Sequence, residues 1–388
     1  MKFDFAERVK RLPPYVFAEM EKLIDEKKKQ GLDLISLSIG DPDLPPPSFI
    51  LEAFRKEAAG PKNHNYSFSQ GEPEFRSAVA NWYRKRFGVD LNPETEVVAL
   101  IGSKEGIANV TRAFVNSGDR VLVPDPAYPV YANGGALLSD GVPIFMPLLE
   151  ENGFRPDFEA ITERKAKMMF LNYPNNPTGA TVDKAFLKQI VEFAEENNII
   201  VCYDNAYSEI TFDGYKAPSI LQVEGGKELA IEFHSCSKTF NMTGDRIGFA
   251  VGNQQLIKGL TKVKSQIDSG PPVYIQKVAV KALESYTSDE PPEYLQKINQ
   301  IYSERRDVLV KSLNSLGFKC GKPKATFYVW LNCECDSVDF AAKLLETGVI
   351  VTPGIGFGAQ GKTYVRISIT RPKEEIKEAC KRMGKISN

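Results

Sequence analysis

Histidine is scarce in this chain, with only His64 and His234 among 388 residues. This scarcity disfavours a catalytic triad or a metal site built on histidine. Cysteine offers no alternative metal site, because Cys333 and Cys335 are separated by one residue rather than two and no second pair accompanies them. We therefore expect no metal and predict chemistry that runs on lysine, tyrosine, aspartate and arginine.

Long apolar runs and net charge are also missing. No stretch approaches the ~18 apolar residues of a membrane span, and residues 1–15 carry charges throughout, unlike a secretory signal. The 49 basic and 50 acidic residues leave a net charge of -1, so we expect neither nucleic acid nor a membrane as a partner. Six scattered cysteines in a chain of this length predict reduced thiols and a cytoplasmic protein.

What the chain does have is an alternation of short β-branched segments and amphipathic segments from about residue 96. Strands are predicted over 96–103, 119–126, 167–174, 199–207, 228–235 and 246–253, and helices over 104–118 and 183–198. This alternation predicts an α/β fold with a mostly parallel sheet between helices.

Beyond residue 285 the pattern becomes that of a smaller α+β domain, which begins with a long charged helix over 292–317. We place a large domain at 46–285 and a small domain at 1–45 together with 286–388, since two-domain chains often bring their ends together. We expect a ligand in the cleft between the domains or beyond the carboxyl ends of the parallel strands.

One apparent nucleotide-binding motif is misleading. The segment GIGFGA at 354–359 matches the glycine spacing of a dinucleotide fingerprint. That fingerprint must open a helix, whereas this segment leads into a predicted strand at 364–370. We therefore interpret it as a loop.

Polar residues follow the predicted strands where they suit a phosphorylated pyridine aldehyde. Such a cofactor needs a lysine that forms an imine and a carboxylate that holds the proton on the ring nitrogen. Lys238 and Asp204 meet these needs. The phosphate needs hydroxyls, backbone N–H groups and a cation, for which the candidates are Ser103, Lys104, Ser235, Ser237 and Arg246.

The rest of the ring has candidates as well. Tyr207 and Asn176 suit the 3'-oxygen, and Tyr128 offers an aromatic face. Taken alone, Ser103 is a helix cap, Asp204 a turn residue and Tyr128 a packing residue. Their order at successive strand ends favours a cofactor site instead.

A series of motifs in this order resembles the class I/II aminotransferases of fold type I, which use pyridoxal 5'-phosphate. The motifs are SIGDPD, GSKEG, DPAYPVY, NYPNNPTG, YDNAYSEI, SCSKTFNMTGDRIG and YVRIS, and the resemblance covers essentially the whole chain. It implies a large domain with a mostly parallel, seven-stranded sheet flanked by helices and a smaller α+β domain. Within this family, RLPPYVFAEMEKLIDE and EFHSCSKTFNMTG are most similar to LL-diaminopimelate aminotransferases.

The resemblance implies the roles that the cofactor chemistry also favours. Lys238 would bind the cofactor covalently and shuttle the proton at the substrate Cα, while Asp204 would face the pyridine nitrogen. Tyr207 and Asn176 would hold the 3'-oxygen, and Tyr128 would stack on the ring. The bond from Asn176 to the following proline is expected to be cis.

The resemblance also implies a homodimer and a set of substrate contacts. Tyr66 resembles a tyrosine that reaches a phosphate in the neighbouring subunit, so we expect active sites shared between two copies. Arg366 would clamp the substrate α-carboxylate, Gly40 would allow a close approach, and Tyr15 would lie over the entrance. The substrate would also contact Lys104, Tyr128 and Asn176.

Three departures from the family pattern affect the loops of the site. Asp245 stands where the family usually has an aromatic residue, just before the phosphate arginine. Pro271 and Pro272 interrupt a usually apolar segment. Ser69 and Gln70 stand where some members carry a carboxylate for the distal ammonium of diaminopimelate.

The expected activity is a ping-pong transamination between an amino acid and 2-oxoglutarate, with LL-diaminopimelate as the donor in lysine biosynthesis. The alternatives with the same fold are an aspartate, alanine or aromatic aminotransferase and a β-eliminating lyase. A regulator that senses pyridoxal phosphate is a remote alternative, because it needs a DNA-binding domain and a basic face.

Overall fold

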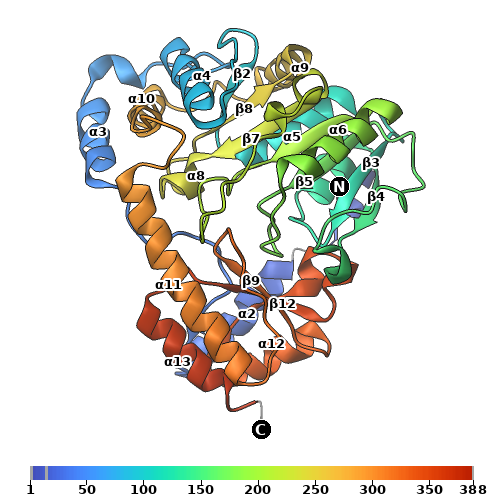
Figure 1. Cartoon of the computed structure of the whole chain (residues 1–388), viewed down its shortest axis with the longest axis vertical. Coiled ribbons are helices and arrows are strands. Elements are labelled where there is room, and N and C mark those ends of the chain that lie inside the picture. Colours follow the sequence, from blue (N-terminus) through green and yellow to red (C-terminus); the bar gives the residue numbers. More distant parts are fainter. Residues whose placement is uncertain (1–2, 14–15, 387–388) are drawn as a thin grey trace.

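The largest sheet of the protein has seven strands, and the computed structural model describes residues 3–13 and 16–386 (Figure 1). The strand order is β2-β8-β7-β6-β5-β3-β4. The strands are β2 (Val97–Leu100), β3 (Arg120–Asp125), β4 (Val142–Pro147), β5 (Met168–Asn172), β6 (Ile200–Asp204), β7 (Ala230–Ser235) and β8 (Gly248–Gly252). Strand β8 runs opposite to the other six strands of this sheet, and the remaining neighbouring pairs are parallel. The predicted mostly parallel sheet is therefore confirmed.

Both faces of this sheet are covered by apolar side chains, as expected for a buried parallel sheet. Along β5, Met168 and Phe170 join one core cluster while Met169 and Leu171 join the other, because successive strand residues point to opposite faces. The helices α5 (Ser103–Phe114) and α9 (Gln254–Lys264) contribute to the first cluster. The second cluster receives α4 (Pro73–Phe87), α6 (Lys184–Asn197) and α10 (Val273–Glu284).

One helix end was predicted wrongly and one strand was not predicted. The helix predicted to continue to Gly118 ends at Phe114, because Val115 is extended and the Asn116 N–H turns back to the Asp119 carboxylate. Strand β4 was not predicted, since its residues Val142–Pro147 include two prolines and are only partly buried. As an edge strand it can tolerate proline.

A second group of elements lies beyond the large sheet (Figure 1). Strands β11 (Thr352–Pro353), β12 (Tyr364–Ser368) and β9 (Tyr328–Asn332) form an antiparallel sheet, and β1 (Ile35–Ser36) pairs in parallel with β10 (Val349–Ile350). The helices of this group are α11 (Glu293–Ser315), α12 (Ser337–Glu346) and α13 (Lys373–Met383). The pairing of β1 places the N-terminal segment beside C-terminal elements.

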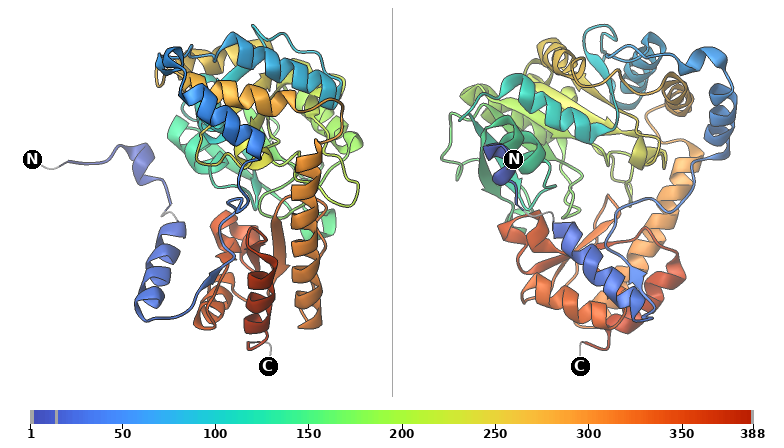
Figure 2. Two further views of the ribbon diagram at one scale, coloured as in Figure 1. Left: turned by 90° about the vertical axis from the view of Figure 1, so that its left-hand side faces the viewer. Right: turned by 180° about the vertical axis from the view of Figure 1, so that it is seen from behind.

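The remaining helices are α1 (Glu7–Lys10), α2 (Val16–Lys29), α3 (Ser48–Ala58), α7 (Gly226–Leu229) and α8 (Cys236–Thr239). Helix α2 lies along the C-terminal elements in both views of Figure 2. The domain boundaries at residues 46 and 285 stay predictions. In the part of the chain that is described, no helix has both the length and the apolar character to cross a membrane.

Candidate active site

A cavity of about 340 Å³ lies where the ends of the large-sheet strands face the second group of elements. Ten of the predicted site residues line it together: Gly40, Ser103, Lys104, Tyr128, Asn176, Asp204, Tyr207, Ser235, Lys238 and Arg366. These residues are far apart in the sequence. Most of them meet because the strand ends of the large sheet share one edge, while Gly40 and Arg366 are supplied by the second group of elements.

Lys238 lies on the short helix α8, which begins directly after β7. The Ser235 hydroxyl caps this helix by accepting the Ser237 N–H at 3.3 Å. The Lys238 Nζ donates to the Gly40 carbonyl at 3.0 Å and lies 5.7 Å from the centre of the Phe327 ring. A side chain at Gly40 would place its Cβ 1.8 Å from the Tyr328 hydroxyl, so glycine is required there. Lys238 thus has one hydrogen-bond partner among the described residues, a backbone carbonyl, and lines the cavity.

Asp204 ends β6 and is only 5% exposed. Its carboxylate accepts the Tyr131 hydroxyl at 2.7 Å and the Ala206 N–H at 3.3 Å. Burial raises the pKa of Asp204 to about 6, although the hydrogen bond from Tyr131 lowers it. Tyr131 is itself held by stacking on Phe170, with ring centres 5.2 Å apart. A nearby positive charge would favour the ionised form of Asp204.

Arg366 is fixed from several sides within the cavity. Its Nη1 donates to Asn176 Oδ1 and its Nη2 to the Ser38 carbonyl, both at 2.8 Å. The guanidinium lies over the rings of Tyr328 and Phe357, at 4.2 and 4.7 Å. Its Nε is buried and has no partner among the described residues. The described residues engage one N–H on each of Nη1 and Nη2, so further N–H donors remain for an anionic ligand.

Asn172 connects Asp204 to the loop that carries Asn176. Its amide donates to the Asp204 carbonyl at 2.7 Å and accepts the Asn176 N–H at 2.7 Å. The bond between Asn176 and Pro177 is cis, as predicted. Asn172 therefore links the main chain of Asp204 to the main chain of Asn176, the two residues predicted to face different parts of one ring.

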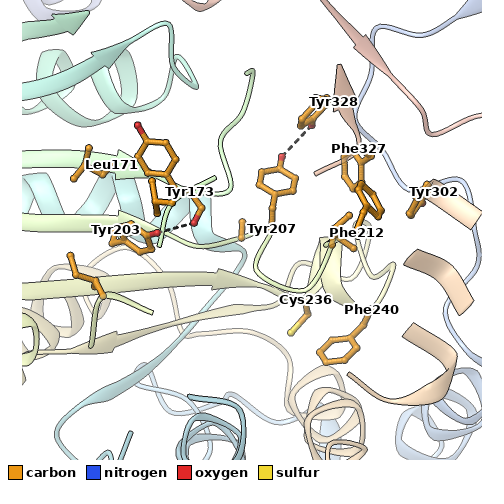
Figure 3. Packing of buried hydrophobic residues seen from close by; sticks show 14 of the residues in the cluster. Leu171, Tyr173, Tyr203, Tyr207, Phe212, Cys236, Phe240, Tyr302, Phe327 and Tyr328 are labelled. Atoms are coloured by element: carbon orange, nitrogen blue, oxygen red, sulfur yellow. Dashed lines mark hydrogen bonds between the residues drawn. The ribbon is translucent and has the colours of Figure 1, made fainter. Parts of the chain in front are cut away.

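Tyr207 faces Tyr328 across the cavity, with 3.1 Å between their hydroxyl oxygens (Figure 3). Burial is the main cause that raises the pKa of Tyr207 well above its usual value, and the neighbouring Tyr328 adds to this effect. The Tyr207 hydroxyl therefore keeps its proton and can donate a hydrogen bond to a ligand oxygen.

The candidate phosphate residues are only partly assembled in the cavity. Ser103 begins α5, which brings its N–H and hydroxyl to a helix N-terminus. Ser237 and Arg246 do not line the cavity. Arg246 donates to the Ile101 and Thr243 carbonyls at 3.0 Å and lies against the turn before Ser103, where a Cβ at Gly102 would meet its Nη2 at 2.3 Å.

Asp245 does not form an ion pair with Arg246 in the described part of the chain. The hydrogen bonds of the Arg246 guanidinium run to backbone carbonyls instead. Burial raises the pKa of Asp245. We find no structural reason for a carboxylate at this position.

The predicted aromatic residues fall in three different places. Tyr128 lines the cavity, with the Lys104 Nζ 6.0 Å from its ring centre. Tyr66 lies outside the cavity and is 92% exposed. Tyr15 lies outside the described residues.

The sequence interpretation missed several residues that line the cavity, namely Glu21, Tyr131, Asn172, Tyr328 and Phe357. Tyr131 and Asn172 belong to motifs that were recognised, DPAYPVY and NYPNNPTG, and their position at strand ends was an available signal. Glu21 lies within RLPPYVFAEMEKLIDE, a segment whose resemblance to the family was noted, but nothing local distinguishes Glu21 or Tyr328 as a cavity residue. Their place depends on how α2 and the C-terminal elements lie relative to the large sheet.

The donor set fits a pyridine aldehyde phosphate. Lys238 lines the cavity together with Lys104, a buried carboxylate has an elevated pKa, and a helix N-terminus carries hydroxyl and N–H donors. The Arg366 guanidinium, which lines the cavity with only two of its five N–H groups engaged by the described residues, adds a donor for a carboxylate. These groups match the imine, the ring nitrogen, the phosphate and an amino-acid carboxylate respectively.

Comparison with known proteins gives consistent results. The family model for "Aminotransferase class I and II" matches residues 33–383. The chain is 51% identical to the LL-diaminopimelate aminotransferase of Desulforudis audaxviator, over 99% of this chain and 98% of the relative. It is 49% identical to the enzyme of that name from Aquifex aeolicus, over 99% of both chains.

Solved structures agree with this relationship. Substrate-bound BacF from Bacillus subtilis superimposes with a TM-score of 0.93 at 39% identity, covering 100% of this chain and 98% of that chain. A mutant aspartate aminotransferase of Thermus thermophilus gives a TM-score of 0.92 at 30% identity, covering 99% of this chain and 100% of that chain. The chain therefore belongs to the class I and II aminotransferases, which are transaminases that depend on pyridoxal 5'-phosphate.

Proposed function

We propose that this transaminase moves an amino group from LL-diaminopimelate to 2-oxoglutarate, giving tetrahydrodipicolinate and glutamate. The observation that carries the proposal is the identity of about half of all residues, over nearly the full length, to relatives with that name. The geometry of Arg366 supports an α-amino acid as the substrate, because its guanidinium is fixed at the cavity while the described residues engage only two of its five N–H groups.

The cofactor, when bound, supplies the electron sink that makes the substrate Cα–H bond acidic. Arg366 would bind the substrate carboxylate, with its fork oriented by the Ser38 carbonyl and by Asn176. The Lys238 Nζ would then move the proton between the substrate Cα and the cofactor's C4'. Its mobility matters for this step, and its partner in the free protein is a single backbone carbonyl.

Asp204 would hold the proton on the ring nitrogen. The positive ring would offset the cost of burying its charge, so its pKa falls when the cofactor binds. The Tyr131 hydroxyl keeps the carboxylate oriented. Tyr207 and Asn176 would hold the 3'-oxygen, while Ser103, Lys104, Ser235, Ser237 and Arg246 would hold the phosphate.

We also propose that the active unit is a homodimer. Tyr66 is 92% exposed and Phe68 66% exposed, which is unusual for aromatic residues on an isolated chain. A surface hollow beside them is lined by His64, Ser67 and the segment 269–272. If a second copy covers this surface, Tyr66 of one subunit would reach the cofactor phosphate bound in the other subunit.

A panel of amino donors with 2-oxoglutarate tests the substrate proposal. Glutamate formation should be fastest with LL-diaminopimelate, compared with aspartate, alanine and phenylalanine at equal concentrations. The enzyme with 2-oxoglutarate but no added donor is the control, because it measures the glutamate formed from amino groups already carried by the cofactor. A good rate with aspartate and none with diaminopimelate would contradict the proposal while leaving the aminotransferase family unaffected.

Subunit complementation tests the shared site. Lys238→Ala and Tyr66→Ala homodimers should both be impaired, and refolding them together should restore activity in the hybrids. In each hybrid, one of the two sites is intact, because it takes Lys238 from the Tyr66→Ala chain and Tyr66 from the Lys238→Ala chain. If Tyr66 acts within its own subunit, mixing gives no recovery.

A further inference from the structure

Two carboxylates line the active-site cavity among the described residues, and they lie in contrasting environments. Asp204 is buried at the end of β6 and is engaged by Tyr131. Glu21 projects from α2 and is exposed to solvent. The cations that line the same cavity are Lys104, Lys238 and Arg366. Glu21 is thus a negative charge on the solvent side of a site whose other charges have predicted roles.

Glu21 is not engaged by any described part of the protein. Among the described residues, its carboxylate forms no hydrogen bond or ion pair, whereas Lys27 on the same helix pairs with Glu346 of α12 at 2.6 Å. That pair attaches α2 to the C-terminal elements. The helix is therefore held in place while the Glu21 carboxylate remains available to a ligand.

The loop that follows Tyr66 cannot supply the same charge. Ser69 and Gln70 are neutral, and the Gln70 amide already donates to the Glu94 and Val97 carbonyls at 2.9 and 3.0 Å. Gln70 is therefore committed to its own backbone surroundings. If the substrate carries a distal ammonium, the available carboxylate in the described cavity is Glu21.

The charged residues of the cavity differ in exposure, since Arg366 is buried and Glu21 is exposed to solvent. The α-carboxylate would meet the fixed Arg366, and the α-carbon would meet Lys238. A side chain that extends from there toward solvent reaches the exposed part of the lining, where Glu21 lies. A positive group at its far end would be attracted to Glu21, and a negative group would be repelled.

We propose that Glu21 is a specificity-determining residue that accepts the distal ammonium of the amino donor. This inference rests on the proposed preference for LL-diaminopimelate. The contact is solvent-exposed, so its contribution is modest: about two- to fivefold in kcat/KM, as for other exposed ion pairs. It acts on the choice of donor and leaves the proton transfer at Lys238 unchanged.

Paired substrates and a matched variant test the role of Glu21. Kinetics of Glu21→Gln are compared with the wild type for LL-diaminopimelate and for 2-aminopimelate, which keeps the chain length and the distal carboxylate but lacks the distal ammonium. Glu26→Gln removes the same charge from the same helix at a position that does not line the cavity. All measurements use the holoenzyme.

Glu21→Gln should raise KM for LL-diaminopimelate about two- to fivefold and leave kcat unchanged. It should not impair 2-aminopimelate, and Glu26→Gln should behave like the wild type. An equal loss with both substrates, or no change with either, would overturn the role of Glu21. If the wild type turns over other donors but not LL-diaminopimelate, the substrate proposal fails instead, and the two failures are distinguishable.

Discussion

Two buried carboxylates on neighbouring strands, Asp204 of β6 and Glu232 of β7, are treated in opposite ways by their surroundings. Glu232 is completely buried and has five hydrogen-bond partners: Tyr83, Asn205, Ser219, His234 and the Ile220 N–H. Asp204 has two donors among the described residues, the Tyr131 hydroxyl and the Ala206 N–H. The protein satisfies the hydrogen-bonding capacity of the Glu232 carboxylate, and it does not satisfy that of Asp204.

Their pKa values follow from this difference. Burial opposes the charge of Glu232, yet hydrogen bonds from His234, Ser219 and Asn205 hold its pKa below its usual range. Burial raises the pKa of Asp204 to about 6. A buried carboxylate whose protein partners are too few is one that awaits an external cation, and for Asp204 that cation is the ring nitrogen of the cofactor.

The strongest way to break the comparison is to neutralise the under-satisfied carboxylate. Asp204→Asn should lower kcat/KM by roughly 10²- to 10⁴-fold, because the ring loses the group that stabilises its proton. The free energy of unfolding of the cofactor-free protein should not fall. Steady-state kinetics and urea unfolding measure the two effects. Near-normal turnover would contradict the assigned role.

Neutralising the satisfied carboxylate should have the reverse outcome. Glu232→Gln leaves several donors without a charged acceptor, so the free energy of unfolding should fall by about 2–4 kcal/mol. The folded fraction should retain its kcat, since Glu232 does not line the cavity. Urea unfolding together with kcat per bound cofactor checks this. If Glu232→Gln kept its full stability but lost its activity, the structural role assigned to Glu232 would be contradicted.

The pH dependence of stability should also differ in sign between the two sites. The pKa of Asp204 is higher in the folded chain than its ordinary 3.8, so the folded state binds the extra proton and loses stability as pH rises from about 4 to 6. At pH 7, Asp204→Asn should therefore stabilise the cofactor-free protein by on the order of 2 kcal/mol. The gain should disappear near pH 4.

Glu232 contributes in the opposite direction. Its pKa is lowered in the folded state, so its contribution is present at neutral pH and is lost as pH falls below the ordinary value of 4.5. Urea unfolding of the wild type and of both variants at several pH values tests this pattern. A stability difference for Asp204→Asn that stays constant from pH 4 to 7 would be inconsistent with an elevated pKa.

The smallest change sharpens the comparison by removing one hydrogen bond. Tyr131→Phe deletes the hydroxyl that lowers the pKa of Asp204, so the acid limb of kcat/KM should move to higher pH, with about a tenfold loss near that limb. Tyr203→Phe is the control, since its hydroxyl donates to the Tyr173 carbonyl (Figure 3). An unshifted pH profile for Tyr131→Phe would argue against a positioning role.

The sequence was sufficient for the features that depend on local pattern. The alternation of strands and helices predicted the large sheet, and the polar residues at strand ends predicted most of the cavity, because parallel strands bring their carboxyl ends together. The edge strand β4 was missed because its prolines and partial exposure obscure the strand pattern.

The rest depends on distant packing. Glu232 and His234 lie in a segment that reads as an ordinary strand, and their burial requires partners from α4 and from residues 205 and 219–220. Glu21 lines the cavity because α2 packs against C-terminal elements. Such contacts have no signature in the neighbouring sequence.

The most direct test of the account is to locate the covalent link between the protein and its cofactor. The holoenzyme is reduced with borohydride, which traps an imine, and its peptides are mapped by mass spectrometry. The account predicts a pyridoxyl group on Lys238, in the peptide that begins after β7, and none in Lys238→Ala. A label on Lys104, or an unmodified Lys238 in fully active enzyme, would contradict it.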